Sequence, residues 1–227
     1  MLKNIISFKN PKSRAAEAFR TLRTNIQFSS LDDQIKSIVV TSAGPGEGKS
    51  TIMTNLAVTI AQSGKRVVVV DCDLRKPTIH KKMGLPNSDG ITNLLAQSKN
   101  LDEVILSTMV PNLFVITSGP IPPNPAELLG TKKMRQVLSE LQEAFDIVLI
   151  DAPPVIAVTD AQILSTLATG VLLVTSYGVT EKFGIAKAKE LLDKVGAKVF
   201  GVILNKVPEK SENYYYGKYY YNYYKNE

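Results

Sequence analysis

The segment Ala43-Gly44-Pro45-Gly46-Glu47-Gly48-Lys49-Ser50-Thr51 constrains the fold of this chain more than any other. An apolar run at residues 37–41 precedes it and predicts a strand, and residues 52–61 follow with a helical pattern. Strand, glycine-rich loop and helix form the context in which a P-loop binds phosphate. The glycines let the backbone aim N–H groups at an anion, and the helix N-terminus adds partial positive charge. The segment therefore predicts a phosphate-binding loop, although Ala43 replaces the first glycine of the strict motif.

Two residues of this loop have predicted chemical roles. Lys49 can reach the β- and γ-phosphates of a nucleotide, and the Ser50 hydroxyl is placed to ligate Mg²⁺. The alternative interpretation is a chance glycine turn between a strand and a helix. The correct flanks and the sequence Gly-Lys-Ser-Thr favour the P-loop.

The composition excludes several classes of protein. Of the 227 residues, 44% are apolar, which is enough to bury a full core, and the single cysteine, Cys72, excludes an internal disulfide. Because the chain has no disulfide, we expect an intracellular, reducing compartment. The N-terminus lacks the apolar region of a signal peptide, and no apolar run approaches the ~20 residues of a membrane span. The net charge of +6 favours anionic partners but is too diffuse to indicate nucleic acid, and no nucleic-acid-binding motif is present.

Strands and helices alternate along the chain, which predicts a doubly wound, mainly parallel α/β sheet. We expect an N-terminal segment and helix at 1–30, a P-loop domain at 31–208 and a tail at 209–227. The predicted strands are 37–41, 66–70, 112–117, 146–150, 170–175 and 197–204. The predicted helices are 13–28, 52–61, 91–96, 101–107, one from 126 or 131 to 144, 159–168 and 180–195.

Carboxylates follow two of these strands. Asp71 and Asp73 come directly after the apolar strand 66–70, and Asp151 ends the strand 146–150. Ligands of α/β sheets bind at the carboxyl ends of the strands, so these side chains are expected beside the P-loop. Asp71 and Asp73 are close enough to share one metal ion or its water shell, and Asp151 fits the Walker B carboxylate that meets the Mg²⁺ shell.

The two ends of the chain each allow more than one interpretation. Glu17, Arg20 and Arg23 line one flank of the helix 13–28, either as a solvated face with an internal ion pair or as an interface with another subunit. Chemistry alone favours the solvated face. The tail holds eight of the nine tyrosines and is either a low-complexity terminus without further function, a substrate for modification or an aromatic adhesive. Those eight are Tyr214, Tyr215, Tyr216, Tyr219, Tyr220, Tyr221, Tyr223 and Tyr224.

Together these segments resemble the bacterial tyrosine kinases (BY-kinases) of the free-standing CpsD/CapB type from exopolysaccharide systems, over nearly the whole chain. Residues 43–51 look like the family's Walker A, 71–77 (DCDLRKP) like its characteristic Walker A′, and 149–154 (LIDAPP) like its Walker B. Residues 119–129 are similar to its proline loop, and the tail matches its autophosphorylation cluster. Glu17, Arg20 and Arg23 match its E-x-x-R-x-x-R motif, which supports ring-shaped oligomers and so favours the interface.

The resemblance implies an ATP- and Mg²⁺-dependent protein-tyrosine kinase on a MinD/ParA-like P-loop fold. Asp71 would be the base, and Asp73 and Asp151, with Asp71 nearby, would hold Mg²⁺ largely through water, with Ser50 as a direct ligand. Lys49 would neutralise charge on the leaving γ-phosphate. The loop backbone of residues 44–51, which includes Gly44, Pro45, Gly46, Glu47 and Gly48, would bind the β-phosphate. Thr51 would touch the α-phosphate, and Asn205 would contact the adenine.

The implied partners are further copies of the chain in a ring, a membrane-anchored activator, protein substrates and a tyrosine phosphatase. The activator would bring this cytoplasmic protein to the inner face of the membrane. Two rival functions are a nucleotide-switched ATPase of the partition type and a nucleotide-binding scaffold without kinase activity. Partition ATPases carry a second lysine early in the loop, where this chain has Gly44.

Overall fold

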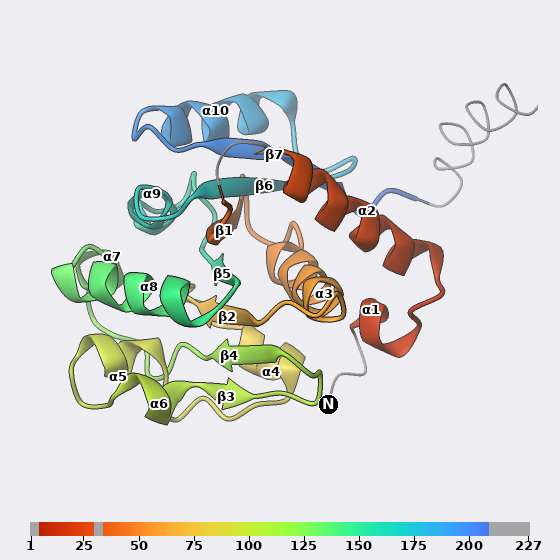
Figure 1. Cartoon of the computed structure of the whole chain (residues 1–227). Coiled ribbons are helices and arrows are strands. Elements are labelled where there is room, and N and C mark those ends of the chain that lie inside the picture. Colours follow the sequence, from red (N-terminus) through yellow and green to blue (C-terminus); the bar gives the residue numbers. More distant parts are fainter. Residues whose placement is uncertain (1–4, 30–33, 209–227) are drawn as a thin grey trace, which may run out of the picture.

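A seven-stranded sheet forms the centre of the described structure (Figure 1). This computed structural model describes residues 5–29 and 34–208, and the eight tail tyrosines lie outside the described residues. The strand order is β3-β4-β2-β5-β1-β6-β7, and all neighbours are parallel except β3 and β4. The predicted doubly wound, mainly parallel sheet is therefore confirmed. The strands are β1 (Ser37–Ser42), β2 (Val67–Asp71), β3 (Leu106–Ser107), β4 (Leu113–Ile116), β5 (Ile147–Asp151), β6 (Gly170–Ser176) and β7 (Val199–Asn205).

Helices cover both faces of the sheet (Figure 1). One face packs against α1 (Ile6–Lys9), α2 (Arg14–Phe28), α3 (Lys49–Ala61) and α4 (Ile79–Met83). The other packs against α5 (Ile91–Leu95), α6 (Leu101–Val104), α7 (Pro125–Leu129), α8 (Lys132–Ala144), α9 (Asp160–Ser165) and α10 (Lys182–Asp193). Among the residues described, no helix has both the length and the apolar character needed to cross a membrane.

The central strands are apolar because they are buried on both faces. Every residue of β1, β2 and β6 is buried. Within β2, Val68 and Val70 join the core on one side and Val67 and Val69 the core on the other. Burial on both faces is typical of a parallel strand flanked by helices, and it explains why β2 reads as four consecutive valines.

The register of the central strands brings the predicted site together. Strand β5 lies between β1 and β2, and Asp151 at its end is level with Asp71 of β2 and Val40 of β1. The loop from β1 to α3 leaves the sheet at the same edge. The sheet therefore gathers the glycine-rich loop and the carboxylates that follow β2 and β5.

Two predicted helices differ from the structure. The helix expected at 101–107 ends at Val104, because Ile105 has an extended backbone and Leu106–Ser107 pairs antiparallel with β4. For the helix expected up to residue 144, the start at 126 is wrong and the start at 131 is confirmed, because Pro125–Leu129 forms a separate helix, α7. Thr131 is extended and accepts a hydrogen bond from the Met134 N–H, so it begins α8 as a new helix.

Candidate active site

The loop between β1 and α3 has the backbone geometry of an anion-binding site. Gly46 and Gly48 have φ angles of 74° and 95°, in the left-handed region that favours glycine. A Cβ atom on Gly48 would also lie 2.2 Å from Nδ2 of Asn205. Gly48 caps α3, so Lys49 and Ser50 stand in the first turn of a helix whose N-terminus opens at this edge. These features suit a bound phosphate.

Lys49 lies between the carboxylates that follow β2 and β5. Its Nζ is 2.8 Å from Oδ2 of Asp73 and 3.2 Å from Oδ1 of Asp151, and Ser50 donates to Oδ2 of Asp151 at 2.6 Å. Burial alone would lower the pKa of Lys49, but Asp151 and Asp73 raise it, and its net pKa is above the ordinary value. The lysine therefore stays charged although it is nearly buried.

Asp71 is fully buried, and its two carboxylate oxygens differ. Oδ2 accepts the backbone N–H groups of Thr78 and Ile79 at 3.1 and 3.0 Å, whereas Oδ1 has no hydrogen-bond partner among the described residues. Burial first, and Asp151 second, raise the pKa of Asp71 to about 8. Burial also raises the pKa of Asp151. One oxygen of Asp71 is thus fixed by the backbone, and the other is the oxygen on which a proton can be gained or lost.

The segment after β2 is held by an ion pair between a half-exposed arginine and a buried carboxylate, which the sequence did not predict. Arg75 donates from Nε and Nη2 to the two carboxylate oxygens of Asp160, at 2.9 and 3.0 Å. Asp160 is fully buried at the start of α9. Asp160 follows β5 in the sequence, but no motif marked it as a partner of Arg75. The pair fixes the segment that carries Asp73.

Side chains distant in sequence contact the phosphate loop. Asn205, at the end of β7, donates from Nδ2 to the Glu47 carbonyl at 2.8 Å, and its predicted contact with adenine remains a prediction. Thr180 donates to the Glu47 side chain, and Lys82 of α4 donates from Nζ to Oγ1 of Thr51 at 2.9 Å. The sequence patterns assigned no role to Thr180 or Lys82.

The oxygen atoms at this edge fit a magnesium ion shared with a nucleotide. Among residues 5–29 and 34–208, no group of three or more His, Cys, Asp and Glu side chains forms a ready-made metal site. Mg²⁺ is usually bound by one or two carboxylates together with substrate phosphates and water. The Ser50 hydroxyl and the carboxylates of Asp73 and Asp151 supply such a set beside the loop.

The charged residues of α2 contact their own chain in this structure. Glu17 and Arg20 form an exposed ion pair one turn apart. Arg23 donates from Nη1 to the Thr59 carbonyl at 3.0 Å, in the last turn of α3, where a cation is favoured. Whether Glu17, Arg20 and Arg23 also bind another subunit remains a prediction.

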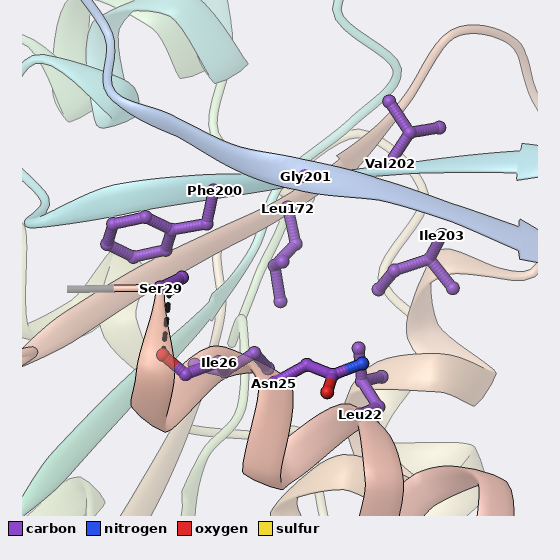
Figure 2. Close-up of a pocket in the computed structure, with 9 residues that line it drawn as sticks. All are labelled: Leu22, Asn25, Ile26, Ser29, Leu172, Phe200, Gly201, Val202 and Ile203. Atoms are coloured by element: carbon purple, nitrogen blue, oxygen red, sulfur yellow. Dashed lines mark hydrogen bonds between the residues drawn. The ribbon is translucent and has the colours of Figure 1, made fainter. Parts of the chain in front are cut away.

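A hollow of about 200 Å³ lies between α2 and the strands β6 and β7. Figure 2 shows Leu22, Asn25 and Ile26 of α2 on one side of it and Leu172 of β6 with Phe200 and Ile203 of β7 on the other. None of its described lining residues is titratable, so it offers no acid or base.

Comparison with known proteins identifies the family. The family model described as "AAA domain" matches residues 35–200. The tyrosine-protein kinase YwqD of Bacillus subtilis is 49% identical over 219 residues, which cover 96% of this chain and 92% of that protein. The chain belongs to the bacterial tyrosine-protein kinases. This confirms the predicted family and enzyme class.

Solved structures agree with this assignment. The crystal structure of the chimerical protein CapA2B2 matches with a TM-score of 0.88 and 43% identity, and covers 91% of each chain. The septum site-determining protein MinD from Pyrococcus horikoshii, solved with Mg-ADP, matches with a TM-score of 0.65 and 24% identity, over 78% of this chain and 75% of that one. At that identity the likeness concerns the fold alone, and it confirms the predicted MinD-like P-loop fold.

Proposed function

We propose that this kinase transfers the γ-phosphoryl group of ATP to its own C-terminal tyrosines, on a neighbouring subunit. The observation that carries the proposal is the meeting of a phosphate loop with a buried carboxylate, Asp71, that has one free oxygen. The functional units would be an N-terminal segment and oligomerisation helix at 1–30, a kinase domain at 31–208 and an acceptor tail at 209–227.

Asp71 is proposed as the base. A tyrosine hydroxyl has a pKa near 10 and is protonated at pH 7, so it benefits from a proton acceptor. Oδ1 of Asp71 would take this proton while the phenolic oxygen forms a bond to the γ-phosphorus. The bond from that phosphorus to the β–γ bridging oxygen breaks, and ADP leaves with the electron pair. The raised pKa of Asp71 makes its ionised form a stronger base than an ordinary carboxylate.

The remaining residues would position ATP. The backbone of residues 44–51 would bind the β-phosphate, Lys49 the γ-phosphate, Thr51 the α-phosphate and Asn205 the adenine. Ser50 would ligate Mg²⁺ directly, with Asp73 and Asp151 acting through water. The ion, when bound, would neutralise charge on the phosphate oxygens. Positioning and electrostatic stabilisation are most of what phosphoryl transfer requires.

Transfer between subunits would explain why the motif on α2 and the tail occur in one chain. The 19 residues from 209 to 227 can span at most about 60 Å, and the tail begins just beyond Asn205, at the edge that carries the phosphate loop. This reach includes a neighbour in a ring formed through Glu17, Arg20 and Arg23. Each phosphotyrosine would add about −1.5 to −2 charges, so we propose that phosphorylated tails weaken the ring.

The biological setting is proposed from the family resemblance. A membrane-anchored activator would supply a cytoplasmic segment and hold the kinase at the inner face of the membrane, where it would regulate capsular or exopolysaccharide synthesis. Other protein substrates and a tyrosine phosphatase would complete the system. No nucleic acid is expected among the partners.

Incubation with γ-labelled ATP and Mg²⁺, with and without the activating segment, tests this function. We expect phosphotyrosine on the tail. Free phosphate without phosphotyrosine would instead support a nucleotide-switched ATPase. Absence of turnover in both conditions would support a nucleotide-binding scaffold. Light scattering before and after exhaustive autophosphorylation tests the effect on the ring, and an unchanged assembly size would contradict it.

A further inference from the structure

We infer that Lys206, the residue directly after β7, is a positioning residue for the phosphate loop. Its Nζ donates to the carbonyl oxygen of Gly46 at 2.7 Å. The preceding residue, Asn205, donates to the carbonyl oxygen of Glu47 at 2.8 Å. Two consecutive residues at the end of the last strand thus hold two consecutive carbonyl groups of the loop. This assignment rests on the proposed function only in taking the ligand to be a nucleotide.

The direction of these carbonyl groups fixes the direction of the neighbouring N–H groups. In a planar trans peptide, the C=O and the following N–H point in opposite directions. A Gly46 carbonyl that faces Lys206 turns the Glu47 N–H away from the lysine, and a Glu47 carbonyl that faces Asn205 does the same for the Gly48 N–H. Within the described part of the chain, neither N–H donates to a protein acceptor. Both are therefore available for an anion held in the loop.

The backbone of Lys206 supports a specific role. Its φ is 58°, in the left-handed region that a residue with a side chain adopts only at a cost. Such conformations persist where surrounding contacts determine them, and they concentrate at functional sites. Here the strained backbone places the amine against the loop, although the side chain is exposed to solvent.

A third contact, from Thr180, means that the loop does not depend on Lys206 alone for its stability. Thr180 donates to a side-chain oxygen of Glu47, and the Asn205 amide also contacts this residue. Glu47 is therefore held even without Lys206. The specific contribution of Lys206 is to the peptide between Gly46 and Glu47. Its loss should weaken the binding of a β-phosphate more than it weakens the fold.

The test compares Mg-ADP and AMP binding to the full-length chain by isothermal titration calorimetry. Lys206→Met removes the donor and keeps most of the side-chain length, whereas Lys206→Arg keeps a donor. Lys65→Met is the matched control, because Lys65 is an exposed lysine between α3 and β2, at the opposite edge of the sheet. We expect Lys206→Met to lower the affinity for ADP about tenfold, the effect of one hydrogen bond from a charged group. AMP, which lacks the β-phosphate, should bind within twofold of wild type, and Lys206→Arg should recover most of the ADP affinity.

Two results would overturn the assignment. One is ADP affinity within twofold of wild type in Lys206→Met, and the other is an equal loss for ADP and AMP, which would indicate general damage to the fold. Because the readout is equilibrium binding, the absence of phosphotyrosine would not affect it. By contrast, a wild-type chain that binds no ADP would overturn the proposed function itself.

Discussion

Two ion-pair clusters in this molecule contain similar groups in opposite environments. At the phosphate loop, the side chains of Lys49, Asp73 and Asp151 are 11%, 6% and 0% exposed. On α2, Arg20 and Glu17 are 33% and 65% exposed. Water screens the exposed pair, whereas the buried charges interact in a medium of lower dielectric constant. The same type of ion pair therefore has different consequences in the two places.

The buried cluster is also unbalanced. Three carboxylates, Asp71, Asp73 and Asp151, surround one lysine, and burial raises the pKa of Asp71 and Asp151. An excess of buried acidic groups lowers the stability of the folded state. Such an excess is typical of sites that bind a cation or a proton. The exposed pair on α2 has one charge of each sign, so it has no such excess of charge. The buried cluster is therefore the candidate site of chemistry, whereas a role of the exposed pair in association between subunits remains a prediction.

The largest effect is expected from Lys49→Met. Removing the cation at the γ-phosphate should lower autophosphorylation by at least about 10³-fold, because positioned charge supplies most of the catalysis of phosphoryl transfer. Phosphotyrosine blotting with γ-labelled ATP measures this loss. Lys132→Met, an exposed lysine at the start of α8, is the control. Equal activity in the two variants would contradict the claim that the buried lysine, unlike the exposed one, takes part in the reaction.

Asp71→Asn should have the next largest effect on rate. The amide oxygen can still accept the N–H groups of Thr78 and Ile79 but cannot take a proton. We expect the rate of phosphotyrosine formation to fall by about 10²–10⁴-fold, the usual contribution of a general base. ADP affinity should change by less than about threefold, and a rate loss that merely follows weaker ADP binding would argue against the role of base.

The pH dependence of the stability of the same variant tests whether burial perturbs Asp71. The pKa of Asp71 is about 8 in the folded protein and near 3.8 when unfolded, so between these values the folded state holds a proton that the unfolded state has lost. Wild-type stability should therefore fall as pH rises, by at most about 1.4 kcal/mol per unit from this group. In EDTA without nucleotide, urea unfolding should show Asp71→Asn gaining stability over wild type from pH 5 to 8. Parallel pH curves would show that burial does not perturb this carboxylate.

Arg75→Gln should have an intermediate effect on stability. It leaves Asp160 buried without its cation, whereas Arg75 itself is 40% exposed and partly screened. We expect a loss of about 1–3 kcal/mol in the free energy of unfolding, less than for a fully buried pair. The double variant with Asp160→Asn should recover part of this loss. Purely additive effects would show that the pair has no coupling.

The smallest effect on stability is expected from Glu17→Gln. An exposed pair contributes less than about 1 kcal/mol, so the urea midpoint should barely move. If the motif is a subunit interface, light scattering should nevertheless show smaller assemblies. A large loss of stability with unchanged assembly size would show that Glu17 supports the fold and does not form a subunit interface.

Local sequence patterns predicted the fold class and the site at the phosphate loop, but they did not predict contacts between residues far apart in the sequence. The phosphate loop and the three aspartates could be placed together because parallel strands end at a common edge. Lys82 with Thr51, and Thr180 with Glu47, are 31 and 133 residues apart, and no local pattern marks such pairs. Strand β3 was taken for helix because its two residues are strand only through pairing with β4.

A mixing experiment tests the central claim most directly. Full-length Lys49→Met provides tyrosines without activity, and an otherwise wild-type chain truncated after Glu209 provides activity without the tail tyrosines. They are mixed with γ-labelled ATP and Mg²⁺ under conditions in which the intact wild-type chain forms phosphotyrosine. We predict phosphotyrosine on the Lys49→Met chain in the mixture and none in either protein alone. An unlabelled Lys49→Met chain, with the wild type labelled at a rate independent of concentration, would contradict transfer between subunits.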